Sequence, residues 1–276
     1  MDFHFSQEEQ NLLDQIHDFA VRDVAPLAAE LDREERFPAE ALQKLRQMQM
    51  MGVCYPKEVG GRGCSYLVYI AMVEELAKYC AATSIMFAAH HSLGAFALSA
   101  LGTPAQKEKY LRPLVTGEKL GAFAATEPGA GTDLGSQQTR AEDKGDHWLL
   151  NGSKIFITNG FYADIYFVSA VTDPSQKSHG ISAFIVEKGT PGFTFGKKEE
   201  KMGIRGSATY ELSFQDCCIP KENLLGELSK GYKMALTTLD GGRISVAAQA
   251  VGIAQGAIDQ CKEYVTGHDM GGQRIA

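Results

Sequence analysis

Residues 148–168 read WLLNGSKIFITNGFYADIYFV and are typical of β structure. Short runs rich in Ile, Phe, Tyr and Val alternate here with the turn pairs Asn151-Gly152 and Asn159-Gly160. Similar β-rich runs lie at residues 181–186 and 211–214, and Pro191-Gly192 forms another turn pair. Short strands separated in this way predict a small antiparallel β-barrel or sandwich, which we place at residues 119–227.

The chain before this domain has the periodicity of helices. Ser6-Gln7-Glu8-Glu9 is a capping box, and Thr103 to Gln106 has the pattern of a second one. Residues 84–101 are apolar almost all round, so we expect them to form a helix in the core. We therefore predict an all-α N-terminal domain at residues 1–118, with helices at residues 7–20, 38–51, 66–80, 84–101 and 104–114.

The helical period returns after Gly226. We expect a short helix at residues 233–239, a turn at Asp240–Arg243 and a long helix at residues 244–265. A lone long helix with an apolar face has nothing to pack against. Residues 228–276 are therefore predicted to be the first, incomplete part of a C-terminal helical bundle, which makes the fold class α+β multidomain.

Composition narrows the functional classes. The 276 residues carry 27 basic and 34 acidic side chains, and this acidic balance argues against nucleic-acid binding. The six cysteines form no CxxC pair and no Cys/His ligand spacing, so we expect no metal site, and their scatter fits a reducing compartment. No secretory signal and no run of roughly 18 apolar residues is recognised, so no membrane span is expected.

Two stretches carry residues suited to a ligand. Residues 123–133 read FAATEPGAGTD, a loop whose glycines let a ligand approach the backbone and whose amides could bind an anion or a ring edge. It is neither a Walker motif nor a Rossmann fingerprint. In residues 154–160, Phe156 and Thr158 fall on the same side of a strand, which suits a flat heterocycle with polar edges. Taken alone, such a loop is more often a plain turn, and such a phenylalanine more often belongs to the core.

Together, five stretches resemble the acyl-CoA dehydrogenase family, in its order and spacing from about residue 4 to residue 265. They read TEPGAGTD at 126–133, NGSKIFITNG at 151–160, KMGIRGS at 201–207, PKENLLG at 220–226 and LDGGR at 239–243. The wording is most similar to that of short-chain, butyryl-CoA type members. The resemblance implies a helical N-terminal domain, a middle β-barrel and a C-terminal four-helix bundle.

The resemblance also implies a set of ligand contacts. FAD would be bound by Phe123, Ala125, Thr126, Gly131, Thr132, Phe156, Ile157 and Thr158. The CoA portion of the substrate would meet Thr132, Ser178, Asp240, Gly241, Gly242 and Arg243. The helix from Phe87 to Leu93 is a candidate wall for the acyl chain. Ala125 stands where the family's motif usually has a branched aliphatic residue.

The implied reaction is dehydrogenation of a short-chain acyl-CoA to the trans-2-enoyl-CoA. A carboxylate takes the α-proton while a hydride leaves the β-carbon for flavin N5. Some relatives keep this base immediately before the arginine of the segment matching Asp240–Arg243, where this chain has Gly242. Others use a glutamate far downstream, so we expect no catalytic base before Ala276.

Other readings remain open at this stage. A relative that binds FAD or acyl-CoA without turnover is an alternative, because the base is not found and residues 268–272 read HDMGG where relatives carry an Arg-x-Gln-Phe-Gly motif. Branched-chain or glutaryl substrates are a second alternative. The resemblance further implies a homotetramer, an electron-transferring flavoprotein as electron acceptor, and a location in the cytoplasm or, in a eukaryote, the mitochondrial matrix.

Overall fold

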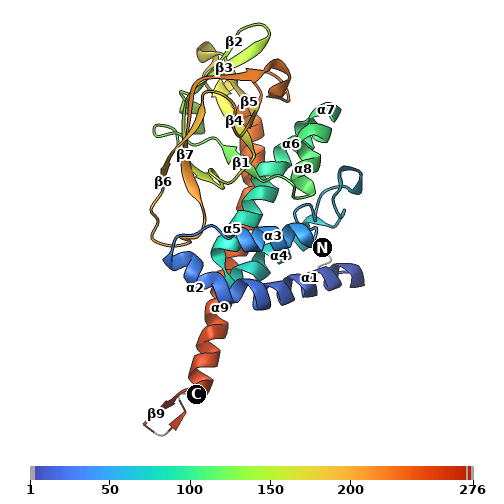
Figure 1. The fold of residues 1–276 in the computed structure, drawn as a ribbon, viewed down its shortest axis with the longest axis vertical. Coiled ribbons are helices and arrows are strands. Elements are labelled where there is room, and N and C mark those ends of the chain that lie inside the picture. Colours follow the sequence, from blue (N-terminus) through green and yellow to red (C-terminus); the bar gives the residue numbers. More distant parts are fainter. Residues whose placement is uncertain (1–3, 272, 275–276) are drawn as a thin grey trace.

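The computed structural model describes residues 4–271 and 273–274. Figure 1 shows a group of helices beside a group of strands, with one long helix, α9, running from the strands past the other helices to the projecting C-terminal end. The N-terminal helical part, the middle β part and the C-terminal helix thus follow one another in the order expected. Three buried apolar clusters fill the interior.

The N-terminal part is built from helices, several of which contain a π-helical turn. Both predicted capping boxes are confirmed, at Ser6 with Glu9 and at Thr103 with Gln106. The elements are α1 (Gln7–Phe19), η1 (Ala20–Val24), α2 (Ala25–Arg33), α3 (Ala39–Gln47), η2 (Lys57–Val59), α4 (Tyr66–Tyr79), α5 (Ala81–Ala89), η3 (His90–Ala95), α6 (Phe96–Leu101), α7 (Pro104–Gln106), η4 (Lys107–Leu111) and α8 (Arg112–Val115).

One expectation for this part is wrong in detail. Helix α3 ends at Gln47 and not near Met51, because Gln49 has a φ of 55°, outside the helical region. One run, Ala81–Leu101, is also long and apolar enough to cross a membrane, although none was expected. Because 67% of its most apolar window is buried inside the protein, this run is the core helix that its composition predicted.

The middle part is one mixed, open sheet, so the predicted antiparallel barrel is wrong. Its strands are β1 (Gly121–Ala124), β2 (Arg140–Asp143), β3 (His147–Thr158), β4 (Ile165–Val171), β5 (Ile181–Glu187), β6 (Phe193–Lys198), β7 (Thr209–Pro220) and β8 (Leu224–Leu225). They follow the order β6-β7-β3-β2-β4-β5-β8, and both β1 and β2 pair with β4 in parallel. The end strands β6 and β8 do not pair with each other, so the sheet does not close. The short segments η5 (Leu134–Ser136), η6 (Pro174–Gly180) and η7 (Lys221–Asn223) lie between strands.

The turn predicted at Asn151-Gly152 is also wrong. Both residues lie inside β3, which runs unbroken through a register shift against β7. Gly152 has a φ of 148°, a conformation that a side chain would strain, so the glycine permits a bulge and not a reversal. The turns expected at Asn159-Gly160 and Pro191-Gly192 are confirmed.

Helix α9 (Gly231–Gly267) is a single helix of 37 residues, so the turn expected at Asp240–Arg243 does not exist. Glycine in a helix interior costs only about 1 kcal/mol relative to alanine, which tertiary packing overrides here. The buried stripe of α9 packs chiefly on α4 and α5. A two-stranded ribbon of β9 (Asp269–Met270) and β10 (Gln273–Arg274) follows it.

The helical part and the sheet meet at a close backbone crossing. A Cβ on Gly94 would lie 2.9 Å from the Cα atom of Gly121, and one on Gly121 would lie 3.0 Å from the Cα atom of Gly94. Next to this crossing, the Gly121 N–H donates to His90 Nδ1 (3.2 Å). His90 Nε2–H is shared between the carbonyls of Met51 (3.2 Å) and Leu114 (3.1 Å). Strand β1, and the loop that follows it, are therefore held at a fixed position against η3.

Candidate active site

The loop after β1 and the strand β3 lie side by side. The Ile155 N–H donates to the Thr126 carbonyl (2.9 Å), and Glu127 and Ala130 close a tight hairpin through two backbone hydrogen bonds of 3.0 and 3.1 Å. At the same place β3 shifts its register against β7, between Lys154 and Ile157. The two stretches that the sequence singled out therefore form one continuous surface.

A buried ion pair holds the loop against the strand. Lys154 is fully buried, and its Nζ atom lies 2.7 Å from Glu127 Oε1, 2.8 Å from Gln137 Oε1 and 3.1 Å from the Ala125 carbonyl. Glu127 also accepts hydrogen bonds from the Thr139 amide (3.1 Å) and from the amide of the preceding residue (2.6 Å). Residues at both ends of the loop thus converge on one ammonium group.

Both members of this pair are charged at neutral pH. Burial opposes the charge of Glu127, but the Lys154 ammonium and the hydrogen bonds that the carboxylate accepts hold the pKa of Glu127 below its ordinary value. Burial lowers the pKa of Lys154 to about 8, against the attraction of Glu127. Glu127 is therefore committed to a structural partner and is not free to exchange protons with a substrate.

The residues predicted to meet FAD divide by exposure. The side chains of Phe123, Ala125 and Ile157 are buried in the core, where only their backbone atoms could face a ligand. Gly131, Thr132 and Phe156 are exposed, and Thr126 and Thr158 are half-buried. The available side-chain surface is therefore formed by the tip of the loop and by the outer face of β3.

Phe156 is the most unusual residue of this surface. Its φ of 60° places a bulky residue in the left-handed region, and 58% of its side chain is exposed. Such a conformation costs of order 1–3 kcal/mol and is concentrated at ligand sites. Nothing in the core requires the ring at this position, which suits stacking against a flat ligand.

The loop tip offers unused hydrogen-bond donors. Among the described residues, the backbone N–H groups of Gly131 and Thr132 have no hydrogen-bond partner. A Cβ on Gly131 would meet nothing within 4 Å, and its φ is not positive, so neither crowding nor backbone strain explains the glycine. Free amides, an open cradle and an exposed ring together fit a planar heterocycle with hydrogen-bond acceptors along its edge, such as the isoalloxazine of FAD.

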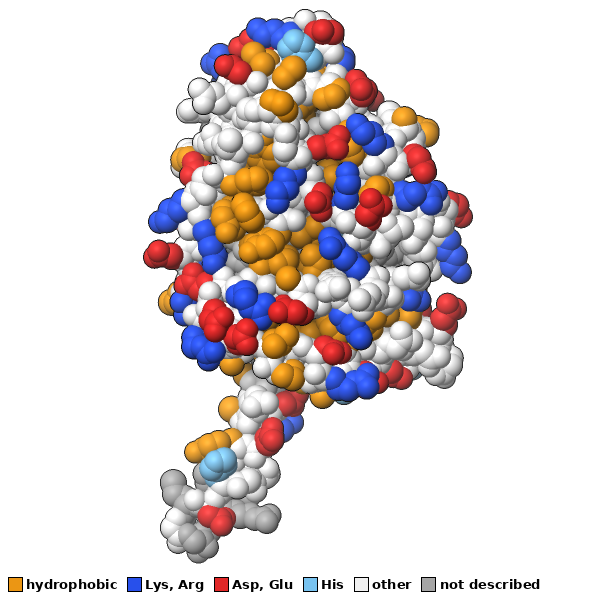
Figure 2. Space-filling model, viewed as in Figure 1, with side chains coloured by type: hydrophobic (Ala, Val, Ile, Leu, Met, Phe, Trp, Pro, Cys, Tyr) orange, Lys and Arg blue, Asp and Glu red, His pale blue; other side chains and the backbone are white. Residues whose placement is uncertain are grey.

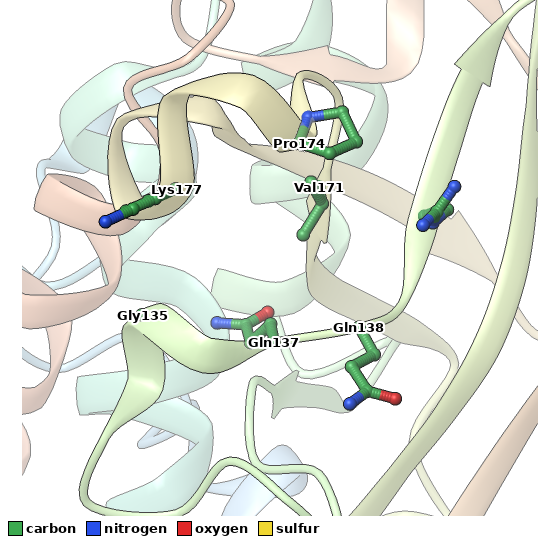
Figure 3. A pocket seen from close by; sticks show the side chains of 7 residues that line it. Gly135, Gln137, Gln138, Val171, Pro174 and Lys177 are labelled. Carbon is green, nitrogen blue, oxygen red and sulfur yellow. The ribbon is translucent and has the colours of Figure 1, made fainter.

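Of the predicted CoA contacts, Ser178 lies where three elements meet. A Cβ on Gly135 would lie 3.2 Å from the Ser178 side chain and 3.8 Å from the Tyr232 ring, which joins η5, η6 and the start of α9. Beside this junction is a polar cavity of about 370 Å³, shown in Figure 3. Its lining residues are Gly135, Gln137, Gln138, Arg140, Val171, Pro174 and Lys177.

An apolar cavity of about 310 Å³ lies between α5, η3 and α9. It is lined by Ile85, Ala88, Ala89, Ser92, Leu93, Leu239, Gly242, Arg243, Ser245 and Val246. The helix segment proposed as an acyl wall does line it, and so do Gly242 and Arg243. Asp240 is exposed and lies 3.5 Å from Arg243 in an ion pair, and a Cβ on Gly241 would lie 3.5 Å from the Tyr66 hydroxyl.

The sequence reasoning gave no role to Lys154 and its partners. Lys154 lies in a strand whose residues alternate between buried and exposed positions, and a lysine in such a strand is expected to face solvent. Only the fold shows that it is enclosed. The signal that was available is the spacing of Glu127 and Gln137 on either side of a glycine-rich loop. Most of the apolar cavity was missed too, because its walls come from helices distant in sequence.

Comparisons with known proteins agree with this architecture. Family models match for the acyl-CoA dehydrogenase N-terminal domain at residues 6–118, the middle domain at residues 122–217 and the C-terminal domain at residues 229–276. A short-chain specific acyl-CoA dehydrogenase of Clostridium acetobutylicum is 51% identical over 265 residues, which cover 96% of this chain and 70% of that protein.

Solved structures are similar over the whole chain. Butyryl-CoA dehydrogenase from Megasphaera elsdenii has a TM-score of 0.96 at 50% identity. The match covers 100% of this chain and 73% of the Megasphaera elsdenii chain. A chain from the work on the electron transferring flavoprotein of Acidaminococcus fermentans has a TM-score of 0.97 at 49% identity, covering 100% and 72%. An acyl-CoA dehydrogenase from Bacillus anthracis complexed with FAD has a TM-score of 0.90 at 35% identity, covering 98% and 46%.

Proposed function

Because this chain belongs to the acyl-CoA dehydrogenase family, we propose that it is an FAD-dependent dehydrogenase of short-chain acyl-CoA thioesters. The reaction converts the substrate to the trans-2-enoyl-CoA. The observation that carries the proposal is the exposed Phe156 ring, held in a strained conformation beside the free amides of Gly131 and Thr132. The high identity to short-chain enzymes favours this activity over a binding protein without turnover.

In this proposal FAD lies on the surface formed by the loop and β3. Phe156 stacks against the ring system, and the Gly131 and Thr132 amides donate to its polar atoms. Thr126 and Thr158 contribute hydroxyls from the half-buried rim, while Phe123, Ala125 and Ile157 support the surface from beneath. When bound, FAD supplies the acceptor for the hydride that leaves the substrate's β-carbon.

The acyl chain is proposed to occupy the apolar cavity between α5 and α9. Its volume of about 310 Å³ suits a short chain, and its walls are predominantly aliphatic. Arg243 is the one charged residue that lines it, and its side chain is 77% exposed, so no buried cation is available to bind a carboxylate at the end of the chain. This composition favours a butyryl group over a glutaryl group.

The CoA portion is proposed to run from this cavity along α9 toward Ser178. Thr132 and Ser178 offer hydroxyls on this route, and the segment Asp240–Arg243 lies at its beginning. Two cationic residues, Arg140 and Lys177, line the polar cavity beside Ser178, and their charge suits the phosphate groups of CoA.

We propose that none of the carboxylates at this site is the catalytic base. Glu127 is held by Lys154, Asp133 accepts a hydrogen bond from Ser136 Oγ, and Asp240 is exposed beside Arg243. A base that removes a weakly acidic α-proton needs a desolvated pocket facing the substrate, whereas each of these groups is held by a structural partner or exposed to solvent. The expectation of a glutamate downstream of Ala276 stays a proposal.

The test is made on this polypeptide itself. Purified protein should carry or take up FAD, seen as flavin absorbance and as quenching of flavin fluorescence in a titration. Addition of butyryl-CoA should change the flavin spectrum, but an artificial electron acceptor should report no turnover by this polypeptide, because no carboxylate at the site is placed as a base. A protein that binds no FAD even after refolding with excess cofactor would refute the proposal.

Several further features belong to the same proposal. We propose domain boundaries after residues 118 and 227, supported by the change from α8 to β1 and from β8 to α9. We also propose that α9 begins a helical bundle and that the protein is a homo-oligomer, because α9 exposes Ile244, Val251 and Ile258, each at least half exposed. Figure 2 shows hydrophobic side chains both on the body of the molecule and on the projecting end of α9.

The electron acceptor and the compartment are proposed as well. An electron-transferring flavoprotein is the acceptor we expect, supported by the similar chain from the work on such a flavoprotein. A reducing compartment, the cytoplasm or the mitochondrial matrix, is supported by the six cysteines, all of which are free thiols.

A further inference from the structure

The buried ion pair of Lys154 and Glu127 does more than satisfy two charges. Its contacts involve Ala125 and Glu127 at the start of the loop and Gln137 at its end, while of the residues between them only Ala130 and Leu134 are buried. A loop of this length has many conformations when its ends are free, so a tie at the ends removes a large part of that freedom.

The geometry of the ammonium group matches this function. A lysine ammonium has three donors and no acceptor, and here its three partners are the Ala125 carbonyl, Glu127 Oε1 and Gln137 Oε1. Gln137 Oε1 accepts a second hydrogen bond from Ser169 Oγ (2.7 Å) on β4. The network therefore connects the loop to two strands of the sheet.

We propose that Lys154 is a positioning residue for ligand binding, which fixes the conformation of the loop at residues 125–139 so that its free amides face the cofactor. The inference rests on the proposed function for the identity of the ligand, but the ordering of the loop does not depend on it. Because Gln137 lines the polar cavity of Figure 3, the same lysine also ties the cofactor side of the loop to the proposed CoA side. Lys154 touches neither ligand in this account and acts through Glu127 and Gln137.

The decisive comparison is between Lys154→Met and the double variant Lys154→Met/Glu127→Gln. The single variant leaves a buried carboxylate without its counter-ion, so it loses stability for a trivial reason. In the double variant one of the Gln138 and Thr139 amides loses its acceptor, because the two amides bond different carboxylate oxygens of Glu127 and a glutamine keeps only one. The double variant nevertheless buries no charge. It therefore removes the tie of the ammonium group without the electrostatic penalty.

Two readouts separate positioning from stability. Hydrogen exchange of the apoprotein, measured where both proteins are fully folded, should show that the Ala130 and Ile155 amides exchange at least 10-fold faster in the double variant. Both amides close the loop through bonds to backbone carbonyls (3.1 and 2.9 Å), so neither loses a side-chain acceptor in the substitution. FAD titration should show a dissociation constant raised at least 10-fold. The control is Lys144→Met, which removes the exposed Lys144–Glu142 pair (2.7 Å) from the neighbouring hairpin and should change neither readout.

Each outcome is informative. Wild-type exchange and wild-type FAD affinity in the double variant would overturn the inference, even if the single variant does not fold. Fast exchange with weakened FAD binding supports it. If wild-type protein binds no FAD, the proposed function fails, and the exchange of the Ala130 and Ile155 amides alone decides whether Lys154 orders the loop.

Discussion

His91 should make the protein sensitive to acid, and a ring substitution should remove much of that sensitivity. Its Nδ1–H donates to the Phe87 carbonyl (3.0 Å), and its Nε2 atom is buried without a hydrogen-bond partner. The ring packs against Tyr69 and Phe87, with centroid distances of 4.8 and 4.3 Å. Burial lowers the pKa of His91 to about 4, so the folded state keeps the ring neutral.

The magnitude follows from the difference between the folded and unfolded pKa values. The unfolded imidazole titrates near 6.5, so between pH 6.5 and pH 4 only the unfolded state takes up a proton, and stability falls as the pH falls. A pH of 5 lies about 1.5 units below this unfolded-state pKa, and each pKa unit corresponds to about 1.4 kcal/mol of free energy. His91 therefore lowers the free energy of unfolding by about 2 kcal/mol at pH 5 relative to pH 7.5.

His90 adds a second contribution of the same sign. Burial, followed by repulsion from His91, lowers the pKa of His90 to about 3. Its Nδ1 atom accepts the Gly121 N–H, so a protonated ring would set one N–H against another. The two rings together should lower the free energy of unfolding by about 4 kcal/mol between pH 7.5 and pH 5.

The variant His91→Phe keeps the stacked ring and removes the titrating nitrogen. We expect its free energy of unfolding, from urea denaturation, to be within about 1.5 kcal/mol of wild type at pH 7.5. It should lose about 2 kcal/mol less than wild type on going to pH 5. The control is Met86→Leu, a nearby buried substitution without a titrating group. It should change the free energy of unfolding by the same amount at pH 7.5 and at pH 5. A pH dependence in His91→Phe equal to that of wild type would refute the reasoning.

Three further predictions concern the site and its supports. Phe156→Gly relieves the strain of the positive φ and should raise the free energy of unfolding by up to about 1 kcal/mol in urea denaturation. FAD titration of this variant should show weaker binding, and stronger binding would contradict the stacking role. Gly242→Ala places a Cβ 3.0 Å from Leu93 Cδ2 in the apolar cavity, so binding titrations should show a greater loss of affinity for hexanoyl-CoA than for butyryl-CoA. Gly252→Ala places a Cβ 2.2 Å from the Glu74 carbonyl and should lower the thermal midpoint, at a cost of about 1–3 kcal/mol; an unchanged midpoint would show that α4 and α9 separate easily.

Local signals in the sequence predicted the parts of the fold that local physics determines. The capping boxes at Ser6 and Thr103 are satisfied within one helical turn, so their pattern is sufficient to locate a helix start. The turn at Asn159 has the same character, because its φ of 63° is one that asparagine tolerates.

The errors came from places where packing overrides local preference. Asn151-Gly152 has the composition of a turn, but pairing with β7 on one side and β2 on the other keeps the strand extended through a bulge. Gly241 and Gly242 weaken a helix, but contact of the buried stripe with α4 and α5 carries α9 through them. The parallel pairing of β1 with β4 joins segments about 40 residues apart, for which no turn signal exists.

The candidate site was predictable in its parts and not in its connections. The motif resemblance identified Phe156 and the loop. The unusual feature of Phe156 is its φ of 60°, which only the structure reveals because it has no signature in the sequence. The role of Lys154 could not be read from the strand pattern because its burial depends on a loop that folds over it. Whether a lysine is solvated or buried in a structural role depends on segments distant in sequence that pack around it, and not on the residue type.

A buried polar contact also connects strand β3, the proposed flavin surface, to the proposed acyl cavity. At the end of β3, Asn159 Nδ2 donates to the Met86 carbonyl of α5 (3.2 Å), two and three residues before Ala88 and Ala89, which line the cavity. Apolar packing alone tolerates small sliding movements, whereas a buried amide that loses its partner costs about 1–3 kcal/mol. Hydride transfer depends steeply on the separation of donor and acceptor, and a misplacement of about 1 Å can cost two orders of magnitude in rate. The Asn159 contact therefore holds the proposed cofactor surface at Phe156 in register with the proposed acyl cavity across the boundary between sheet and helices.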